Sequence, residues 1–167
     1  MKLPNTYTNK NETGCCAVPN IQDWDEQAVS FEGKKFIRMY TRNFLYIPLN
    51  MAKVMTRLQQ SVAAAGAEMP PQQGMILSHD LSPWKAEHLY AVSKNVPGAE
   101  NVELSGDFLT KVFEGPFQDA KKWYASLLAF AKAKGMTAKE VYFFYTTCPK
   151  CAKHYGKNYT IGLAKVS

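Results

Sequence analysis

Hydrophobic positions along the chain follow two periods, which predict short strands separated by two helices. The first helix is indicated by apolar residues that recur every three or four positions from Met51 to Val62, and Gly66 is placed to end it. Stretches crowded with β-branched and aromatic residues predict the strands around it. In the first half these strands are residues 35–48, 75–79 and 88–95, and a loop spans residues 80–87.

The second half of the chain repeats this order of elements. A strand over residues 104–114 precedes a helix over residues 116–135, and a final hairpin ends the chain. The hairpin strands are residues 140–146 and 159–166, joined by a loop over residues 147–158. We therefore predict a single α+β domain, residues 31–167, built from two β-α-β-β repeats at about 36–96 and 104–166. Residues 1–30 form a loose arm that docks through Trp24.

Charge and composition narrow the function classes. The net charge is +6, but the basic residues are spread through the chain without a nucleic-acid-binding motif, so we expect no nucleic-acid partner. The longest apolar run, residues 125–131, is too short to span a bilayer, and the polar N-terminus has no secretory pattern. We expect a cytoplasmic protein without membrane contact. Aromatic residues make up 13% of the chain, which suits either a core or the wall of a ligand pocket.

The four cysteines fall into two close pairs, Cys15 with Cys16 and Cys148 with Cys151. In a reducing compartment such pairs are thiols or metal ligands before they are disulfides. We expect the two pairs to approach each other. A structural zinc ion held by all four, with His154 as a substitute for one, is the first alternative. Free or redox-active thiols are the second, and they are favoured because adjacent cysteines chelate one tetrahedral ion awkwardly. No cofactor is expected to be required.

Four longer motifs carry a resemblance to a known family. They are Ser82-Pro83-Trp84, the segments 96–101 and 108–116, and the segment 145–153. Together they resemble a bacterial subgroup, often named simply hydrolase, of the gyrase-inhibitor-like (GyrI-like) small-molecule-binding superfamily. The resemblance implies two SHS2-type β-α-β-β units around a pseudo-twofold axis. It further implies a curved antiparallel sheet with helices on one face and a ligand groove on the other.

The same resemblance implies what the protein does. The superfamily includes effector-binding domains of multidrug-sensing regulators and stand-alone proteins, some of which hydrolyse strained electrophilic rings in toxic compounds. The chain carries no helix-turn-helix segment beside the repeats, so it resembles the stand-alone kind. The multidrug-sensing domains usually place an acidic residue in the last hairpin to meet cationic ligands. Residues 142–167 contain no Asp or Glu, which leaves selectivity for cations open.

Hydrolysis of a strained ring requires an acid, a base or orienter for water, and apolar walls. We expect Glu114 and Tyr145 to be catalytic. Glu114 could instead stabilise the N-terminus of the following helix, and Trp84 could be either a lid over a ligand or a plug in the core. His79 and His88 are expected to be surface or satisfied histidines. The residues expected to contact the ligand are Trp84, Glu87, Tyr90 and Phe143.

Three functions from different classes follow. The leading hypothesis is a protein that binds hydrophobic organic molecules between the repeats and hydrolyses strained, cyclopropane-type compounds, which would serve detoxification. The second is non-catalytic binding that sequesters such molecules or reports them to a partner. The third is a protein-interaction module that holds a macromolecule such as a gyrase subunit.

Overall fold

The computed structural model describes residues 3–167, apart from the side chain of Pro149. Seven strands and three α-helices follow one another over this part of the chain. Their bounds are β1 Gln27–Phe44, β2 Ile47–Pro48, α1 Met51–Ala65, β3 Ile76–Ser82, β4 Lys85–Ala91, β5 Glu100–Glu114, α2 Ala120–Ala133, β6 Glu140–Tyr145, α3 Pro149–Tyr155 and β7 Tyr159–Lys165. Two single 3-10 turns, Pro71–Gln73 and Phe117–Asp119, precede β3 and α2. None of the helices in residues 3–167 is long and apolar enough to cross a membrane.

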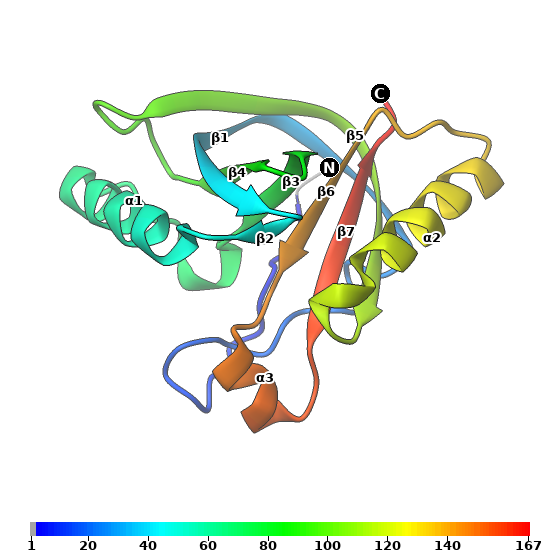
Figure 1. Cartoon of the computed structure of the whole chain (residues 1–167), viewed down its shortest axis with the longest axis horizontal. Helices are drawn as coiled ribbons and strands as arrows, with labels where there is room; N and C mark the ends of the chain where they lie inside the picture. Colours follow the sequence, from blue (N-terminus) through cyan, green and yellow to red (C-terminus); the bar gives the residue numbers. More distant parts are fainter. Residues whose placement is uncertain (1–2) are drawn as a thin grey trace.

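The strands form one antiparallel sheet that closes into a curved six-stranded barrel (Figure 1). The strand order is β1-β4-β3-β6-β7-β5, and β5 pairs back onto β1. Short β2 adds a hairpin to the free end of β1. Closure removes the exposed edges that a long open sheet would present to other chains.

Two helices cover the outer face of the barrel on opposite sides (Figure 1). The apolar stripe of α1 packs Leu58 and Val62 against Ile37 of β1. The stripe of α2 packs Trp123 and Leu127 against Phe113 of β5. As the sequence predicts, α1 ends at Gly66, which adopts a left-handed conformation with φ 62°.

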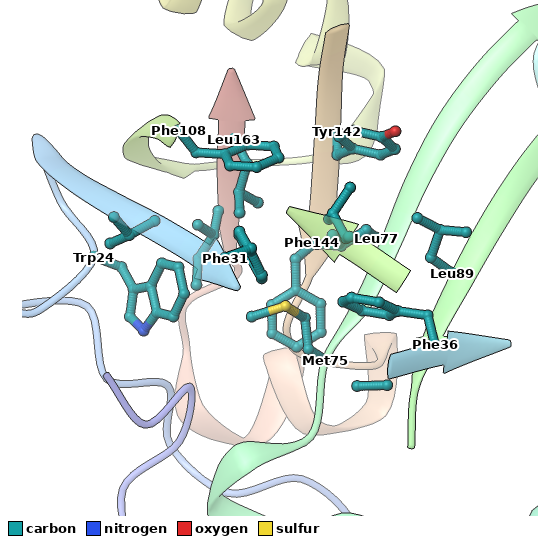
Figure 2. Packing of buried hydrophobic residues seen from close by; sticks show 14 residues of the cluster. Trp24, Phe31, Phe36, Met75, Leu77, Leu89, Phe108, Tyr142, Phe144 and Leu163 are labelled. Atoms are coloured by element: carbon teal, nitrogen blue, oxygen red, sulfur yellow. The ribbon is translucent and has the colours of Figure 1, made fainter. Parts of the chain in front are cut away.

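The inner face of the barrel carries a cluster of buried apolar side chains over its middle (Figure 2). The members of this cluster come from the arm and from every long strand. They are Trp24, Val29, Phe31, Phe36, Met75, Leu77, Leu89, Ala91, Leu104, Phe108, Tyr142, Phe144, Ile161 and Leu163. The resemblance implied a ligand groove on the face away from the helices. Among the described residues, the central part of that face is occupied by this buried cluster, and the groove stays a prediction.

The order β-α-β-β occurs twice, in residues 27–91 and 100–165. The pairings repeat as well, since β4 pairs with β1 as β7 pairs with β5. Equivalent strands of the two halves also meet, β1 with β5 and β3 with β6. The geometric superposition of the halves stays a prediction.

Two predicted loops contain regular structure. The first loop, residues 80–87, is mostly strand, because β3 and β4 continue to a tight turn at Pro83-Trp84. The second, residues 147–158, contains α3, which begins with a proline whose restricted φ suits the first helical position. In addition, β1 begins at Gln27, well before the predicted residue 35, because β5 supplies a partner for its first residues.

The N-terminal arm, residues 3–26, closes one end of the barrel. Trp24 is fully buried and donates a hydrogen bond from Nε1 to the carbonyl of Asn5 at 2.9 Å. The hydroxyl of Tyr7 donates to the carbonyl of Thr146 at 2.7 Å, just beyond β6. The arm therefore docks through Trp24, as predicted, and seals the end of the barrel near α3.

Candidate functional site

Four neighbouring strands each contribute one residue to a row across the inner face, at the end of the barrel away from the arm. Tyr40 of β1 lies opposite Glu87 of β4, and Glu87 lies opposite His79 of β3. The rings of His79 and Tyr142 of β6 are 5.4 Å apart, which continues the row. Because paired residues in a sheet share a face, these four side chains project together. We call Tyr40, Glu87, His79 and Tyr142 the polar row.

An arginine lies beside the polar row, two residues before Tyr40 on the same face of β1. Arg38 Nε is 3.2 Å from Glu87 Oε2, and Arg38 Nη1 is 3.0 Å from Glu100 Oε1. The Glu87 side chain is only 14% exposed, so this ion pair is shielded from solvent more than an ordinary surface pair. Arg38 therefore holds the carboxylate of Glu87 in position beneath the end of the barrel.

Tyr142 carries the most perturbed hydroxyl of the polar row. It donates a hydrogen bond to Glu140 Oε2 at 2.6 Å. Burial, followed by this bond to Glu140, raises the pKa of Tyr142 well above its usual value. In Figure 2 Tyr142 lies at one edge of the packed cluster, with its hydroxyl turned away from Phe108. The phenol is a proton donor at any ordinary pH.

The ring of His79 has a defined tautomer when it is neutral. Its Nδ1 lies 3.1 Å from the carbonyl oxygen of Val141, which can only accept, so Nδ1 carries the proton. The lone pair is then on Nε2. A backbone carbonyl that orients an imidazole in this way is a common arrangement for a general base.

Exposed apolar side chains continue from the polar row along β1, β3 and the β3–β4 turn. Tyr40 belongs to the row itself, Leu81 lies two residues beyond His79, and Phe44 lies four residues beyond Tyr40. Trp84, in the β3–β4 turn, packs on Phe44 with ring centroids 5.7 Å apart. We call these four the apolar rim. Their exposed fractions are 38% for Tyr40, 56% for Phe44, 47% for Leu81 and 56% for Trp84.

The β1–β2 hairpin beside the apolar rim is conformationally strained. Leu45 and Tyr46 have φ values of 47° and 71°, which bulky residues rarely adopt. Tyr46 N donates to the carbonyl of Pro83 at 2.9 Å, which ties the hairpin to the turn that carries Trp84. Such strain persists where the surrounding structure enforces it, often beside ligand sites.

The two residues of the predicted catalytic pair project from opposite faces of the sheet. Tyr145 pairs with Thr160 and Glu114 pairs with Tyr159, and successive residues of β7 face opposite sides of the sheet. Tyr145 therefore projects from the outer face, whereas Glu114 is on the inner side at the arm end, where Lys157 Nζ is 3.9 Å away. The two side chains therefore do not share a face of the sheet, and their joint catalytic role stays a prediction.

The predicted ligand residues are divided between the faces in the same way. Glu87 and Trp84 lie in the polar row and the apolar rim. Tyr90 and Phe143 are on the outer face, because they pair with Ile37 and Gly162, which face the helices. Only the first two of these four residues therefore belong to one constellation.

Tyr145 has an environment of its own on the outer face. Its ring is 6.3 Å from that of Phe143, which in turn is 6.3 Å from Trp123 of α2. Burial, and then the negative charge of Asp80, raises the pKa of Tyr145 to about 12. Burial also raises the pKa of Asp80. Tyr145 and Asp80 therefore form a second, electrostatically linked pair outside the polar row.

His88, also on the outer face, is a satisfied buried histidine as expected. Its Nδ1 lies 2.8 Å from Ser78 Oγ and its Nε2 lies 2.9 Å from Thr41 Oγ1. The Thr41 hydroxyl donates to Asn43 Oδ1, so Nε2 must donate to Thr41. Burial lowers the pKa of His88 to about 4, and the ring is neutral near pH 7.

Sequence reasoning did not find Arg38 or three members of the polar row, which are Tyr40, His79 and Tyr142. The sequence predicts only a surface or satisfied histidine at His79, because its neighbours in the row are distant in sequence. The usable signal was alternation in each strand, since Arg38 and Tyr40 share one face of β1 and His79 shares a face with Leu77. Alternation, however, gives no register between strands.

A cavity of about 310 Å³ lies elsewhere, between the arm and β1. It is lined by Leu3, Pro4, Thr6, Ser30, Glu32, Lys34, Gln73 and Met75. None of the predicted site residues lines it, and burial lowers the pKa of Lys34 in its wall.

The two cysteine pairs approach each other, as predicted. The sulfur atoms of Cys15, Cys16, Cys148 and Cys151 all lie within 4.8 Å of one another. Thr13 Oγ1 is 3.2 Å from Cys151 Sγ, and this hydrogen bond is the main cause that lowers the pKa of Cys151 to about 6. Burial raises the pKa of Cys16 to about 12.

Comparison with known families identifies the class of this protein. The model of the bacterial hydrolase family matches residues 6–166, nearly the whole chain. The chain therefore belongs to the bacterial hydrolase family. No curated protein matches the sequence.

Solved structures share the fold at low identity. An uncharacterized conserved protein from Listeria innocua is 12% identical with a TM-score of 0.62, over 86% of this chain and 94% of its own. A hydrolase from Listeria innocua is 11% identical with a TM-score of 0.62, over 86% and 92%. SAV2435, solved bound to tetraphenylphosphonium, is 14% identical with a TM-score of 0.52, over 84% and 93%. At such identities these similarities establish the fold alone.

Proposed function

We propose that this protein is a hydrolase for hydrophobic organic compounds with a strained, electrophilic ring, and that the substrate binds at the polar-row end of the barrel. The observation that carries the proposal is the polar row beneath the apolar rim. Charged and aromatic groups converge there in a chain whose family is bacterial hydrolase. A few polar groups below a mainly apolar surface are typical of sites for organic ligands.

The apolar rim supplies the binding energy. Two aromatic rings, Phe44 and Trp84, present more than half of their surface to solvent. Covering them with an apolar ligand stabilises the complex by about 25 cal/mol for each Å² of apolar surface removed from water. Detoxification is the biological role that such broad apolar recognition suits.

The polar row supplies the chemistry. His79 Nε2 takes a proton from a water molecule whose oxygen attacks an electrophilic ring carbon. As the new C–O bond forms, the ring bond breaks and its electron pair moves to the leaving atom. The imidazolium of His79 then returns its proton to that atom, so the product is the substrate plus one water. Glu87, held by Arg38, stabilises the positive charge on His79.

Two carboxylates at the polar row favour a positively charged ligand. SAV2435 binds tetraphenylphosphonium, an aromatic cation. In the present chain Glu87 and Glu140 lie at the polar row, although residues 142–167 contain no acidic residue. We infer that aromatic cations bind here more tightly than neutral aromatic analogues of similar size. Titration calorimetry with tetraphenylphosphonium and a neutral analogue tests this preference.

Turnover of a panel of aromatic cyclopropanes and epoxides tests the activity. Mass spectrometry should detect products that have gained one water. His79→Asn keeps a donor for the carbonyl of Val141 but removes the base, so kcat should fall about 10²- to 10⁴-fold. Glu114→Gln and Tyr145→Phe are matched controls, away from the polar row, and should keep the rate of the unmodified protein.

Other outcomes separate the alternatives. If Glu114→Gln abolished turnover and His79→Asn did not, the catalytic centre would lie at the arm end. If aromatic ligands bound without turnover, non-catalytic binding would replace hydrolysis. If no small molecule bound but a protein partner such as a gyrase subunit did, the rim would be an interaction surface.

A further inference from the structure

The four cysteines form a cluster that the polar row does not use. Cys15 and Cys16 lie in the arm, while Cys148 and Cys151 lie at the start of α3. All are free thiols, and their sulfur atoms lie within 4.8 Å of one another. Cys15 and Cys148 are more than 130 residues apart in the sequence, but their sulfur atoms are only 4.0 Å apart.

The spacing of the sulfur atoms fits a tetrahedral ion. Zinc binds thiolates at about 2.3 Å, so two sulfurs of a tetrahedral site are about 3.8 Å apart. Cys15 Sγ is 3.7 Å from Cys16 Sγ and 4.0 Å from Cys148 Sγ. Adjacent cysteines often diverge, but both of these place their sulfurs within 4.8 Å of the other pair's sulfurs. The geometric objection to a shared site is thereby met.

The surroundings already hold the thiols together. Thr13 Oγ1 accepts hydrogen bonds from the backbone N–H groups of Cys15 and Cys16 at 3.2 Å, and it contacts Cys151 Sγ at the same distance. Cys151 is buried, whereas Cys15 is exposed. The cluster therefore lies at the surface with one ligand accessible to an entering ion.

We propose that Cys15, Cys16, Cys148 and Cys151 bind one zinc ion as thiolates. Four protein ligands complete a tetrahedral shell and leave no position for water, so the site is structural rather than catalytic. Zinc binding displaces the thiol protons into solvent, and no electron transfer is involved. The ion ties the arm to α3 and so secures the sealed end of the barrel.

His154 is excluded from the ligand set. It lies on α3, close in sequence to Cys151, but its Nε2 is 3.1 Å from Glu12 Oε2. The cluster of candidate ligand atoms contains the four sulfurs without it. His154 is therefore a suitable control, since its substitution alters α3 without removing a ligand.

Metal analysis of the reduced full-length protein, purified without added metal, is the first test. We expect one zinc per chain by mass spectrometry. Exchange with cobalt(II) should produce thiolate-to-metal charge-transfer bands and the strong visible absorption of a tetrahedral site. Cys16→Ser and Cys151→Ser should each lose both signals, whereas His154→Asn should keep them. Reduced protein that takes up neither zinc nor cobalt would overturn the proposal, as would zinc that survives both cysteine substitutions.

A second measurement covers the case in which a cysteine variant does not fold. Chelation of the unmodified protein should remove zinc and expose the arm to limited proteolysis within residues 3–26, while re-addition of zinc should restore protection. A chelator that removes zinc without changing the cleavage pattern would contradict the role of the ion in tying the arm. Because turnover is not measured, this result is independent of the proposed hydrolase activity.

Discussion

The two ends of the barrel differ in how far their side chains are covered by the rest of the chain. At the arm end, Trp24 is fully buried and the arm contacts the chain beyond β6. At the other end Trp84 is more than half exposed, above an arginine and a glutamate that are partly buried. Trp24 at the arm end is part of the packed core, whereas Trp84 at the polar-row end is open to a ligand. The contrast assigns stabilising packing to the arm end, whereas the function that we propose uses the polar-row end.

The largest effect is expected from Trp24→Ala. The indole is buried and its N–H is bonded to Asn5, so its loss removes apolar contacts and leaves a cavity. The free energy of unfolding should fall by about 3–5 kcal/mol, as measured by urea denaturation. A change below about 1 kcal/mol would contradict the view that the arm end stabilises the barrel.

The next largest effect is a pH dependence of the free energy of unfolding that comes from His88 on the outer face. Its folded pKa of about 4 lies below the unfolded value of about 6.5. As the pH falls, His88 therefore binds a proton in the unfolded chain before it does so in the folded protein. The resulting stability is fully present above about pH 6.5 and is lost as the pH falls toward 4. The loss should reach roughly 3 kcal/mol.

Denaturation of the protein and of His88→Gln at several pH values measures this effect. The substitution keeps polar atoms for Ser78 and Thr41 but cannot titrate. Its unfolding free energy should depend less on pH in that window. Equal pH dependence of the two proteins would show that another group is responsible.

A smaller effect is expected from Tyr142→Phe, in the polar row. The ring stays in the core, but the hydrogen bond to the Glu140 carboxylate is lost. We expect a destabilisation of roughly 1–2 kcal/mol, because the bond involves a charged acceptor and is partly buried. Tyr145→Phe on the outer face is the matched control, with a change within about 0.5 kcal/mol. A larger loss for Tyr145 would reverse the ranking of the two tyrosines.

The smallest effect on stability is expected from Trp84→Ala. This ring is exposed and contacts mainly Phe44, so the unfolding free energy should change by no more than about 0.5 kcal/mol. Binding of an aromatic ligand should weaken by about tenfold, since an aromatic contact contributes about 1 kcal/mol beyond its buried area. Fluorescence titration of the unmodified protein and of Trp84→Ala with the same aromatic ligand measures this loss of affinity. Unchanged affinity together with lost stability would make Trp84 a plug rather than a ligand contact.

Much of the fold was predictable from local signals. The stripe of α1 and its end at Gly66, the position of α2 and the burial of Trp24 were all predicted and are confirmed. The approach of the cysteine pairs was predicted too. The turn at Pro83-Trp84 and the helix α3 were missed because short elements depend on partners that a local pattern does not reveal.

The candidate site was predictable only in part. Glu87 and Trp84 were expected at a ligand site and lie in the polar row and the apolar rim. Tyr145 and Glu114 were expected to act together, but they face opposite sides of the sheet. His79 was expected to be a surface or satisfied histidine, but its ring lies against that of Tyr142, more than sixty residues later in the sequence.

The sequence by itself determined the order of elements, the helix ends and the alternation within each strand, because these depend on residues a few positions apart. The tertiary structure alone decided which faces of different strands meet. Side chains alternate every residue, so a register shift of one position would move Glu87 or His79 to the other face. That register is set by closure of the barrel and by the packing inside it. The polar row exists only because four strands, each with its own alternation, are fixed in one register.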